Sequence, residues 1–164
     1  MKNTQSIFQA RLDVLKHLLG VAAAHFGNES FLALRIAPDM LPFGTQVAFT
    51  CNQPRNFALW CKGQPLDNLD GNVTSLQQAQ RYIDETHALL TAAAPSDAKL
   101  AESVRIDLGP AMYAEMPGAA YVHDFLLPNF YFHLVTAYDI LRMAGVDLGK
   151  KDYMLQIGPF IRQR

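Results

Sequence analysis

The chain has 164 residues, of which 50% are hydrophobic and 18% are charged. This balance supports a packed core and one globular domain over residues 1–164, and it excludes a disordered or acidic solvating chain. Lysine and arginine number 14 against 15 aspartate and glutamate residues, without a concentrated basic stripe, so nucleic acid is not an expected partner.

The sequence also argues against a membrane or secretory role. No apolar run approaches the ~20 residues that span a bilayer, and the first residues lack a secretory pattern. We therefore expect a cytoplasmic protein with no membrane partner. Cys51 and Cys61 fall on one predicted helix, where a rise of ~1.5 Å per residue separates them by about 15 Å, so we expect reduced thiols.

Residues 6–26 are predicted to form the first helix, because apolar residues recur there at alternating spacings of three and four. Ser6 and Gln9 suit a capping box at its start, and Gly27 suits its end. A short extension over residues 29–36 is expected to add one or two helical turns.

A second helix is predicted over about residues 42–62, and a loop over residues 63–73. Pro54 lies inside this helix and removes a hydrogen bond, so we expect a kink or two shorter helices. The third helix is predicted over about residues 74–94, with Ser75 and Gln78 as a second capping box.

Between residues 103 and 117 the apolar period changes to two, which predicts a short β-hairpin or an extended loop. The last helix is predicted over about residues 128–144, with a preceding helical turn over residues 119–127. The fold class is therefore all-α: a four-helix bundle with a long crossover, including this hairpin or loop, before the last helix.

One face of the last helix carries the most suggestive polar residues. Asn129 and His133 are four residues apart and project from the same side, with Thr136 one turn further on. Metal enzymes use this spacing because two side chains on successive turns converge on one ion. A buried, hydrogen-bonded structural role for Asn129 and His133 is the competing interpretation.

Several short strings carry a resemblance to a known family. Near the C-terminus these are PNFYFH at 128–133, TAY at 136–138, LR at 141–142, GV at 145–146 and GKKDY at 149–153. Earlier in the chain they are RIAPDMLP at 35–42 and QV at 46–47. With them the chain resembles a domain-of-unknown-function branch of the DinB/YfiT-like superfamily.

That resemblance implies an up-down bundle, commonly dimeric, with a long connection before the last helix. Many superfamily members hold a divalent metal with three histidines, and some are thiol-dependent transferases or isomerases. This sequence departs from the pattern, because Asn129 and Ala137 flank His133 at the four-residue spacing. The second helix has no histidine and offers Gln46, Thr50 and Asn52 instead.

One imidazole with neutral amides holds a transition ion weakly, so no metal or other cofactor is expected. If zinc or nickel is bound, the expected ligands are His133 with Asn129 and with Asn52 or Cys51. Asp39 or Asp124 is the carboxylate substitute.

The remaining histidines are weaker candidates. His17 and His25 are expected at the surface of the first helix. His87 lies close to the inward stripe of the third helix, so it is expected to approach the bundle centre. The pair His123 and Asp124 is expected to cap the last helix or to stand at the mouth of a pocket.

Three functional hypotheses follow. The first is a degenerate metal site in a non-catalytic bundle or one that binds a small molecule; its pocket residues are Asn129, His133, Tyr138, Gln46 and Thr50. The second is a divalent-metal-dependent enzyme of the thiol-dependent transferase type, with an altered ligand set around His133. The third is a structural homodimer, motivated by apolar residues off the main stripes, which are Phe49, Phe57, Trp60 and Phe132.

Overall fold

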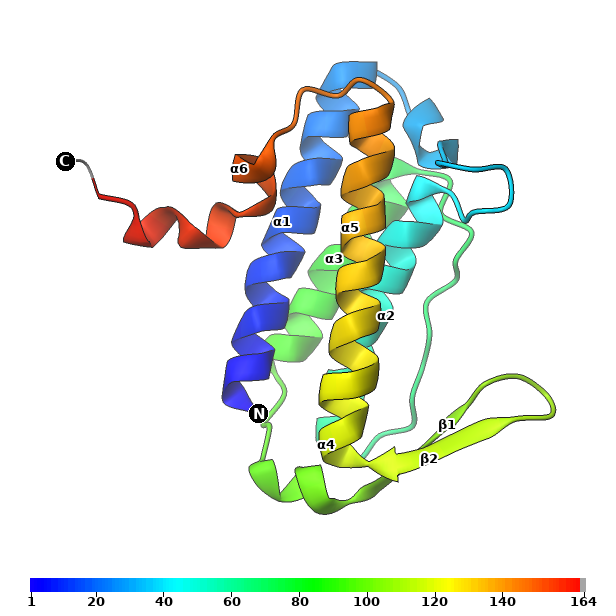
Figure 1. Ribbon diagram of the computed structural model, residues 1–164, viewed down its shortest axis with the longest axis vertical. Helices are drawn as coiled ribbons and strands as arrows, with labels where there is room; N and C mark the ends of the chain where they lie inside the picture. Colours follow the sequence, from blue (N-terminus) through cyan, green and yellow to red (C-terminus); the bar gives the residue numbers. More distant parts are fainter. Residues whose placement is uncertain (163–164) are drawn as a thin grey trace.

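The computed structural model describes residues 1–162. Four long helices pack side by side: α1 (Lys2–Phe26), α2 (Phe43–Cys61), α3 (Leu76–Thr91) and α5 (Leu127–Met143) (Figure 1). The shorter elements are η1 (Ser30–Ala33), η2 (Asp97–Ala101), β1 (Ser103–Asp107), β2 (Tyr113–Pro117), α4 (Gly118–Ala120), η3 (Tyr121–Leu126), α6 (Lys150–Tyr153) and η4 (Leu155–Phe160). Within residues 1–162, no helix combines the length and apolar character needed to cross a membrane.

The helices confirm the four-helix bundle, with two long connections. The expected connection before the last helix is present and contains the hairpin. A second connection, residues 62–75, climbs the length of the bundle, so α2 and α3 run in the same direction (Figure 1). Helix α1 runs opposite to α3, since Gln5 of α1 bonds the Leu90 carbonyl near the end of α3, and Lys16, further along α1, pairs with Asp84, earlier in α3.

Side chains of α2 hold the climbing connection in place. Asn56 Oδ1 accepts a hydrogen bond from the backbone N–H of Asp67 at 3.0 Å, and Asn52 Oδ1 accepts one from Leu69 at 2.8 Å. The two asparagines are one turn apart on α2, so they bind the loop at two points along the helix axis. The loop is therefore fixed along one face of α2.

The core lies between the four helices, where the predicted apolar stripes meet. Phe8 of α1 packs edge-on against Phe57 of α2 and Phe130 of α5, with ring centroids 5.5 Å and 5.0 Å apart. Each aromatic pair adds about 0.5–1.5 kcal/mol to the free energy that burial alone supplies. The other large, fully buried side chains include Leu12, Leu15, Leu18, Leu19, Phe31, Phe43, Ile83, Leu90 and Tyr121.

Helix α1 begins earlier than predicted. It starts at Lys2, and Ser6 lies inside it, donating a hydrogen bond to the Lys2 carbonyl instead of capping the end. Gln9 binds Thr91 of α3. The predicted capping box at Ser6 is therefore wrong, because both side chains have other partners. The predicted end is confirmed, since Gly27 adopts the left-handed conformation with φ 65°.

Helix α2 continues through Pro54, so the alternative of two shorter helices is wrong. The lost hydrogen bond costs about 3 kcal/mol. Burial on both sides of the proline offsets this cost, since Val47 and Cys51 before it and Phe57 and Ala58 after it are fully buried. At α3 the Ser75 half of the predicted capping box is confirmed, because the Ser75 side chain accepts a hydrogen bond from Gln78 N. The Gln78 half is not formed, since Gln78 Oε1 accepts from Thr74 N at 3.3 Å.

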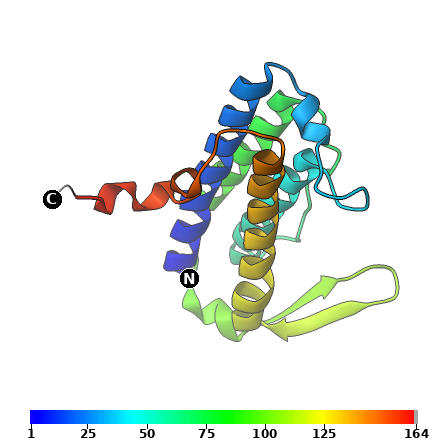
Figure 2. The same ribbon diagram turned by 45° about the horizontal axis from the view of Figure 1, so that its top comes forward.

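The predicted hairpin is confirmed. β1 pairs antiparallel with β2, with Ile106 opposite Ala114. Val104 and Ile106 of β1 are buried, as the alternation of period two requires. The far end of the hairpin projects beyond the bundle (Figure 2).

The helical structure predicted before the last helix is confirmed, and it is continuous with that helix. Residues Gly118–Ala120 are helical, Tyr121–Leu126 form a π-helix, and α5 follows directly. Pro128 has no N–H to complete a regular turn, and a wider turn before it accommodates that loss. The π-helix also turns Tyr121 toward α2, where its ring packs edge-on against Trp60 at 5.4 Å.

Candidate functional site

The structure joins two of the predicted pocket residues directly. His133 Nδ1 of α5 lies 2.8 Å from Gln46 Oε1 of α2. The Gln46 amide is oriented by its other end, where Nε2 donates to the Leu41 carbonyl at 3.1 Å. Because Oε1 is only an acceptor, Nδ1 of the imidazole carries the hydrogen. Nε2 of the neutral His133 ring is then the unprotonated nitrogen.

The surroundings of His133 keep it neutral. The ring is half-buried, and Phe49 packs edge-on against it with centroids 5.3 Å apart. Burial penalises the charged imidazolium and lowers the pKa of His133 to about 4. At neutral pH the ring is therefore an uncharged hydrogen-bonding group.

The residues expected to replace the superfamily's histidine ligands do not fit a divalent ion. Asn129 Nδ2 donates to the Phe125 carbonyl at 2.9 Å, and Asn52 Oδ1 is held by Leu69 N. Cys51 is fully buried, and burial raises the pKa of its thiol to about 12, so it stays protonated. The donors that remain near His133 are neutral amides, which transition ions disfavour.

No carboxylate completes the set. Asp39 and Asp124 are both exposed. Within the described residues 1–162, no group of three or more histidine, cysteine, aspartate or glutamate side chains is arranged to hold a metal ion.

Two further predicted pocket residues lie elsewhere. Thr50 is buried, and its hydroxyl donates to the Gln46 backbone carbonyl at 2.7 Å. Tyr138 is five residues after His133, which places it about 140° around the helix. Its ring packs against Tyr153 of α6 at 5.9 Å. The structure thus brings His133 and Gln46 together, leaves Thr50 bonded to the backbone of α2, and leaves Tyr138 on another side of α5.

The other histidines serve surface contacts. His87 is 39% exposed and lies 3.7 Å from Asp13 of α1, so the expectation that it approaches the bundle centre is wrong. Its position on the helix faces the α1 surface instead of the core. His17 Nε2 lies 2.9 Å from Asp152 Oδ1 and joins α1 to α6. His123 is exposed.

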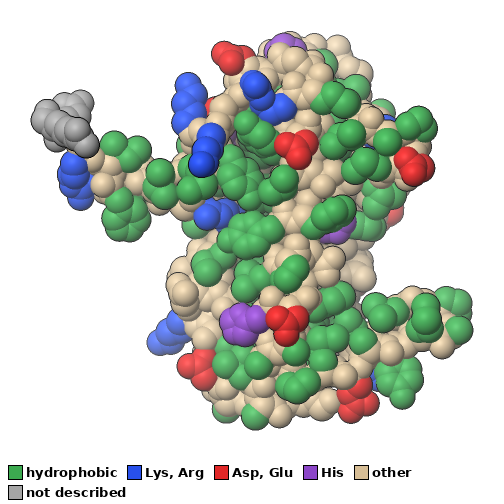
Figure 3. Space-filling model, in the orientation of Figure 1, with side chains coloured by type: hydrophobic (Ala, Val, Ile, Leu, Met, Phe, Trp, Pro, Cys, Tyr) green, Lys and Arg blue, Asp and Glu red, His purple; other side chains and the backbone are tan. Residues whose placement is uncertain are grey.

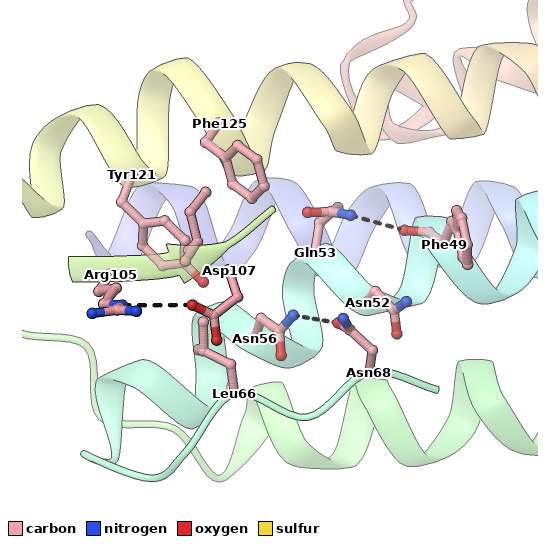
Figure 4. A pocket seen from close by; sticks show the side chains of 11 residues that line it. Phe49, Asn52, Gln53, Asn56, Leu66, Asn68, Arg105, Asp107, Tyr121 and Phe125 are labelled. Carbon is pink, nitrogen blue, oxygen red and sulfur yellow. Dashed lines mark hydrogen bonds and ion pairs between the residues drawn. The ribbon is translucent and has the colours of Figure 1, made fainter. Parts of the chain in front are cut away.

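A cavity of about 650 Å³ lies beside Phe49, between α2, the climbing connection, β1 and η3 (Figure 4). Its volume is in the range of pockets that hold small molecules. Phe49 contacts both this cavity and the ring of His133. The lining residues are Phe49, Asn52, Gln53, Asn56, Leu66, Asn68, Arg105, Ile106, Asp107, Tyr121 and Phe125.

Side-chain amides dominate the polar part of the cavity wall. Asn56 Nδ2 donates to Asn68 Oδ1 at 2.8 Å, and Gln53 Nε2 donates to the Phe49 carbonyl at 3.3 Å. Figure 4 shows these side chains below Tyr121 and Phe125, which reach down from the helix above. Amides offer both donors and acceptors without net charge.

Tyr121 supplies an unused hydroxyl. The side chain is 1% exposed, and its hydroxyl has no hydrogen-bond partner among the described residues. Figure 4 shows Tyr121 among the lining side chains, beside Asp107 and above Asn56. Burial raises the pKa of Tyr121, so the phenol is protonated and can donate. An unpaired buried hydroxyl costs about 1–3 kcal/mol, which a bound acceptor would recover.

The hairpin forms the rim of the cavity. Arg105 Nε lies 3.5 Å from Asp107 Oδ1, and the Arg105 guanidinium stacks 3.9 Å from the centroid of the Tyr113 ring. The two opposite charges therefore offset each other. The rim carries no net charge to select an ionic ligand.

Sequence reasoning missed most of this cavity. The available signal was the pair Asn52 and Asn56, which lie four residues apart on a predicted helix and so project from the same face. The loop, the hairpin and the π-helix contribute the remaining wall, and their meeting depends on tertiary packing. The π-helix in particular has no signature in the sequence beyond Pro128.

Comparisons with known proteins agree with this architecture. A crystal structure of a DinB family member protein from Shewanella denitrificans is similar to this chain, with a TM-score of 0.78 and 27% sequence identity, over 92% of this chain and 88% of that chain. No curated protein matches the sequence. The family described as "Domain of unknown function (DUF1993)" matches residues 2–154. The chain therefore belongs to the DUF1993 family, on a DinB-like fold.

Proposed function

We propose that this protein binds a small, uncharged molecule in the cavity between α2 and the hairpin, and that the metal site of its superfamily is degenerate. The observation that carries the proposal is a cavity of about 650 Å³ lined by four side-chain amides and three aromatic rings, with the buried, unpartnered Tyr121 hydroxyl in its wall. Native proteins rarely leave such a group unpaired without a use for it.

The lining defines the class of ligand. Phe49, Tyr121 and Phe125 offer aromatic faces, which suit a flat ring or an apolar body. The amides and the Tyr121 hydroxyl suit carbonyl, hydroxyl or amide groups on its edge. Arg105 and Asp107 compensate each other at the rim, so a neutral ligand fits better than an anion or a cation.

The His133 and Gln46 pair has a supporting role in this proposal. Neither residue lines the cavity, and Phe49 lies between the pair and the cavity. The hydrogen bond between the His133 and Gln46 side chains fixes α2 against α5, and the His133 ring positions the ring of Phe49. The metal-dependent transferase alternative finds no support in the donors around His133.

The test is a screen of neutral heteroaromatic amides and alcohols by thermal shift, followed by calorimetric titration of the best compound. The proposal predicts binding to the wild type and about tenfold weaker binding to Tyr121→Phe, the loss of one hydrogen bond. Gln53→Ala is expected to weaken binding as well.

The matched control is Tyr131→Phe, which removes a phenol hydroxyl from α5 outside the cavity lining. This variant is expected to bind like the wild type. Absence of binding from all neutral compounds, or binding that is unaffected by both Tyr121→Phe and Gln53→Ala, would refute the proposal.

A further inference from the structure

The C-terminal segment forms an arm that leaves the bundle. We define the arm as residues 155–162, which follow α6, contact α1 and extend outward beyond the bundle (Figures 1 and 2). Its large side chains are apolar and exposed, with Phe160 78% and Ile161 65% exposed. Leu155 and Ile157 are also exposed. A short arm gains little by holding such side chains in water, so it calls for a covering surface.

A matching apolar face lies on α5. Phe132 is 60% exposed, Val135 40% and Met143 55%. Figure 3 shows hydrophobic side chains gathered over the front of the molecule, where α5 lies in Figure 1. Beside this face, a shallow groove of about 210 Å³ separates α5 from α6 and is lined by Val135, Tyr138, Asp139, Lys150 and Tyr153. We call this the α5 groove.

We propose that the arm of one copy docks in the α5 groove of a second copy, and that the exchange is reciprocal. The occupant is a second copy because the arm cannot reach the groove of its own chain without reversing. Tyr153 already lines the groove, and the arm starts two residues later and runs the other way, past α1 (Figure 2). If a twofold axis relates the two copies, each arm meets the α5 groove of the other copy, so both contacts form together.

The α5 groove carries one acidic and one basic side chain, Asp139 and Lys150, and the acidic one is the complement of a charge on the arm. Arg162 near the end of the arm donates only to the backbone carbonyls of Pro159 and Ile161. Asp139 at the edge of the α5 groove is exposed and forms no ion pair within residues 1–162. An arm docked with Phe160 in the groove brings the guanidinium toward this carboxylate.

Reciprocal docking brings the exposed side chains of two arms and two α5 faces together. Specific interfaces bury roughly 1,200–2,000 Å² in total, so a stable dimer requires both contacts. The off-stripe residues that motivated a dimer from sequence contribute unequally, since Phe57 and Trp60 are buried in their own core. Phe132 alone among them is largely exposed and belongs to the proposed interface.

The first test is the mass of the full, untagged chain in solution, measured by sedimentation. The expected result is a dimer of twice 18.3 kDa. Phe160→Ser and Phe132→Ser are each expected to weaken the dimer at least tenfold. The control Met112→Ser, at the hairpin tip and 65% exposed, is expected to leave it unchanged.

The second test identifies the pairing. Phe160→Cys in one preparation and Val135→Cys in another are mixed and oxidised, and the expected product is a mixed disulfide between the two. Asp139→Arg and Arg162→Asp are each expected to weaken the dimer, and the two together to restore it. A monomeric wild type, or a dimer disrupted by Met112→Ser and not by Phe160→Ser, would overturn the proposal.

Discussion

His133 Nδ1 of α5 and Gln46 Oε1 of α2 lie 2.8 Å apart and form a direct hydrogen bond between two core helices. In the arrangement that the superfamily resemblance implies, an ion would connect these helices through imidazole ligands. Here the amide of Gln46 meets the imidazole itself, and Leu41 holds that amide in place. Two neutral side chains therefore join α2 and α5 at the place where the superfamily resemblance implies a metal ion. The ligand site that we propose lies elsewhere in the bundle.

The first prediction concerns metal. Untagged protein incubated with zinc or nickel and then desalted is expected to retain far less than one ion per chain, because His133 is bonded to a neutral amide and packed against aromatic rings. Elemental analysis measures the retained ion. The His133→Ala variant is expected to give the same value. Retention near one ion per chain that disappears in His133→Ala would contradict the degenerate site.

The second prediction concerns pH. His133 has a pKa of about 4 in the folded protein, below its ordinary value of 6.5. Between these values the unfolded chain binds a proton that the folded chain does not, so stability falls as pH decreases from about 6.5 to about 4. The loss is on the order of 2 kcal/mol, less than the full shift implies because the ring is partly exposed.

Urea unfolding at a series of pH values measures this effect. His133→Gln keeps a donor for Gln46 but does not titrate, so its stability is expected to fall less across the same window. Parallel pH curves for the wild type and His133→Gln would show that another group is responsible.

The third prediction concerns Tyr121 without ligand. Because its buried hydroxyl has no partner among the described residues, Tyr121→Phe is expected to leave the free energy of unfolding unchanged or to raise it by about 1 kcal/mol. The control Tyr82→Phe removes a hydroxyl that accepts from Gln78 at 3.1 Å and is expected to cost about 0.5–1 kcal/mol. Chemical denaturation compares the two. A larger loss in Tyr121→Phe than in Tyr82→Phe would show that the Tyr121 hydroxyl is already satisfied.

The fourth prediction concerns the start of the last helical stretch. A Cβ at Gly118 would lie 2.2 Å from the Lys99 carbonyl oxygen and 2.7 Å from Trp60 Cζ2. Gly118→Ala is therefore expected to destabilise the protein by about 1–3 kcal/mol. The control Gly20→Ala in α1 meets nothing within 4 Å and is expected to stabilise it by about 0.5–1 kcal/mol. Equal thermal stability of the two variants would contradict the close packing at Gly118.

Local patterns predicted much of the fold. Patterns of residues close together in the sequence predicted the apolar stripes of α1 and α3, the cap at Ser75 and the hairpin. The start of α1 was misplaced because Ser6 hydrogen-bonds within the helix instead of at its end. Pro54 was given too much weight, since burial along α2 outweighs one missing hydrogen bond.

The cavity was harder to predict, because its wall comes from elements far apart in the chain. Gln46 and His133 are 87 positions apart and were both named as candidates, yet their direct contact needed the packed bundle. The π-helix places Tyr121 at the cavity wall. Asn68 lies on a loop that side chains of α2 hold in place, including Asn56. No spacing rule joins such residues.

The most direct measurement is the nitrogen-15 spectrum of the protein during titration with the tightest neutral compound from the screen. The side-chain amide signals of Asn52, Gln53, Asn56 and Asn68 are expected to shift and saturate together, since these groups line the cavity. The imidazole signals of His133, which lies outside the lining, are expected to change little. Shifts confined to His133 and Gln46, with the cavity amides unaffected, would contradict the account and move the binding site to the position of the superfamily's metal.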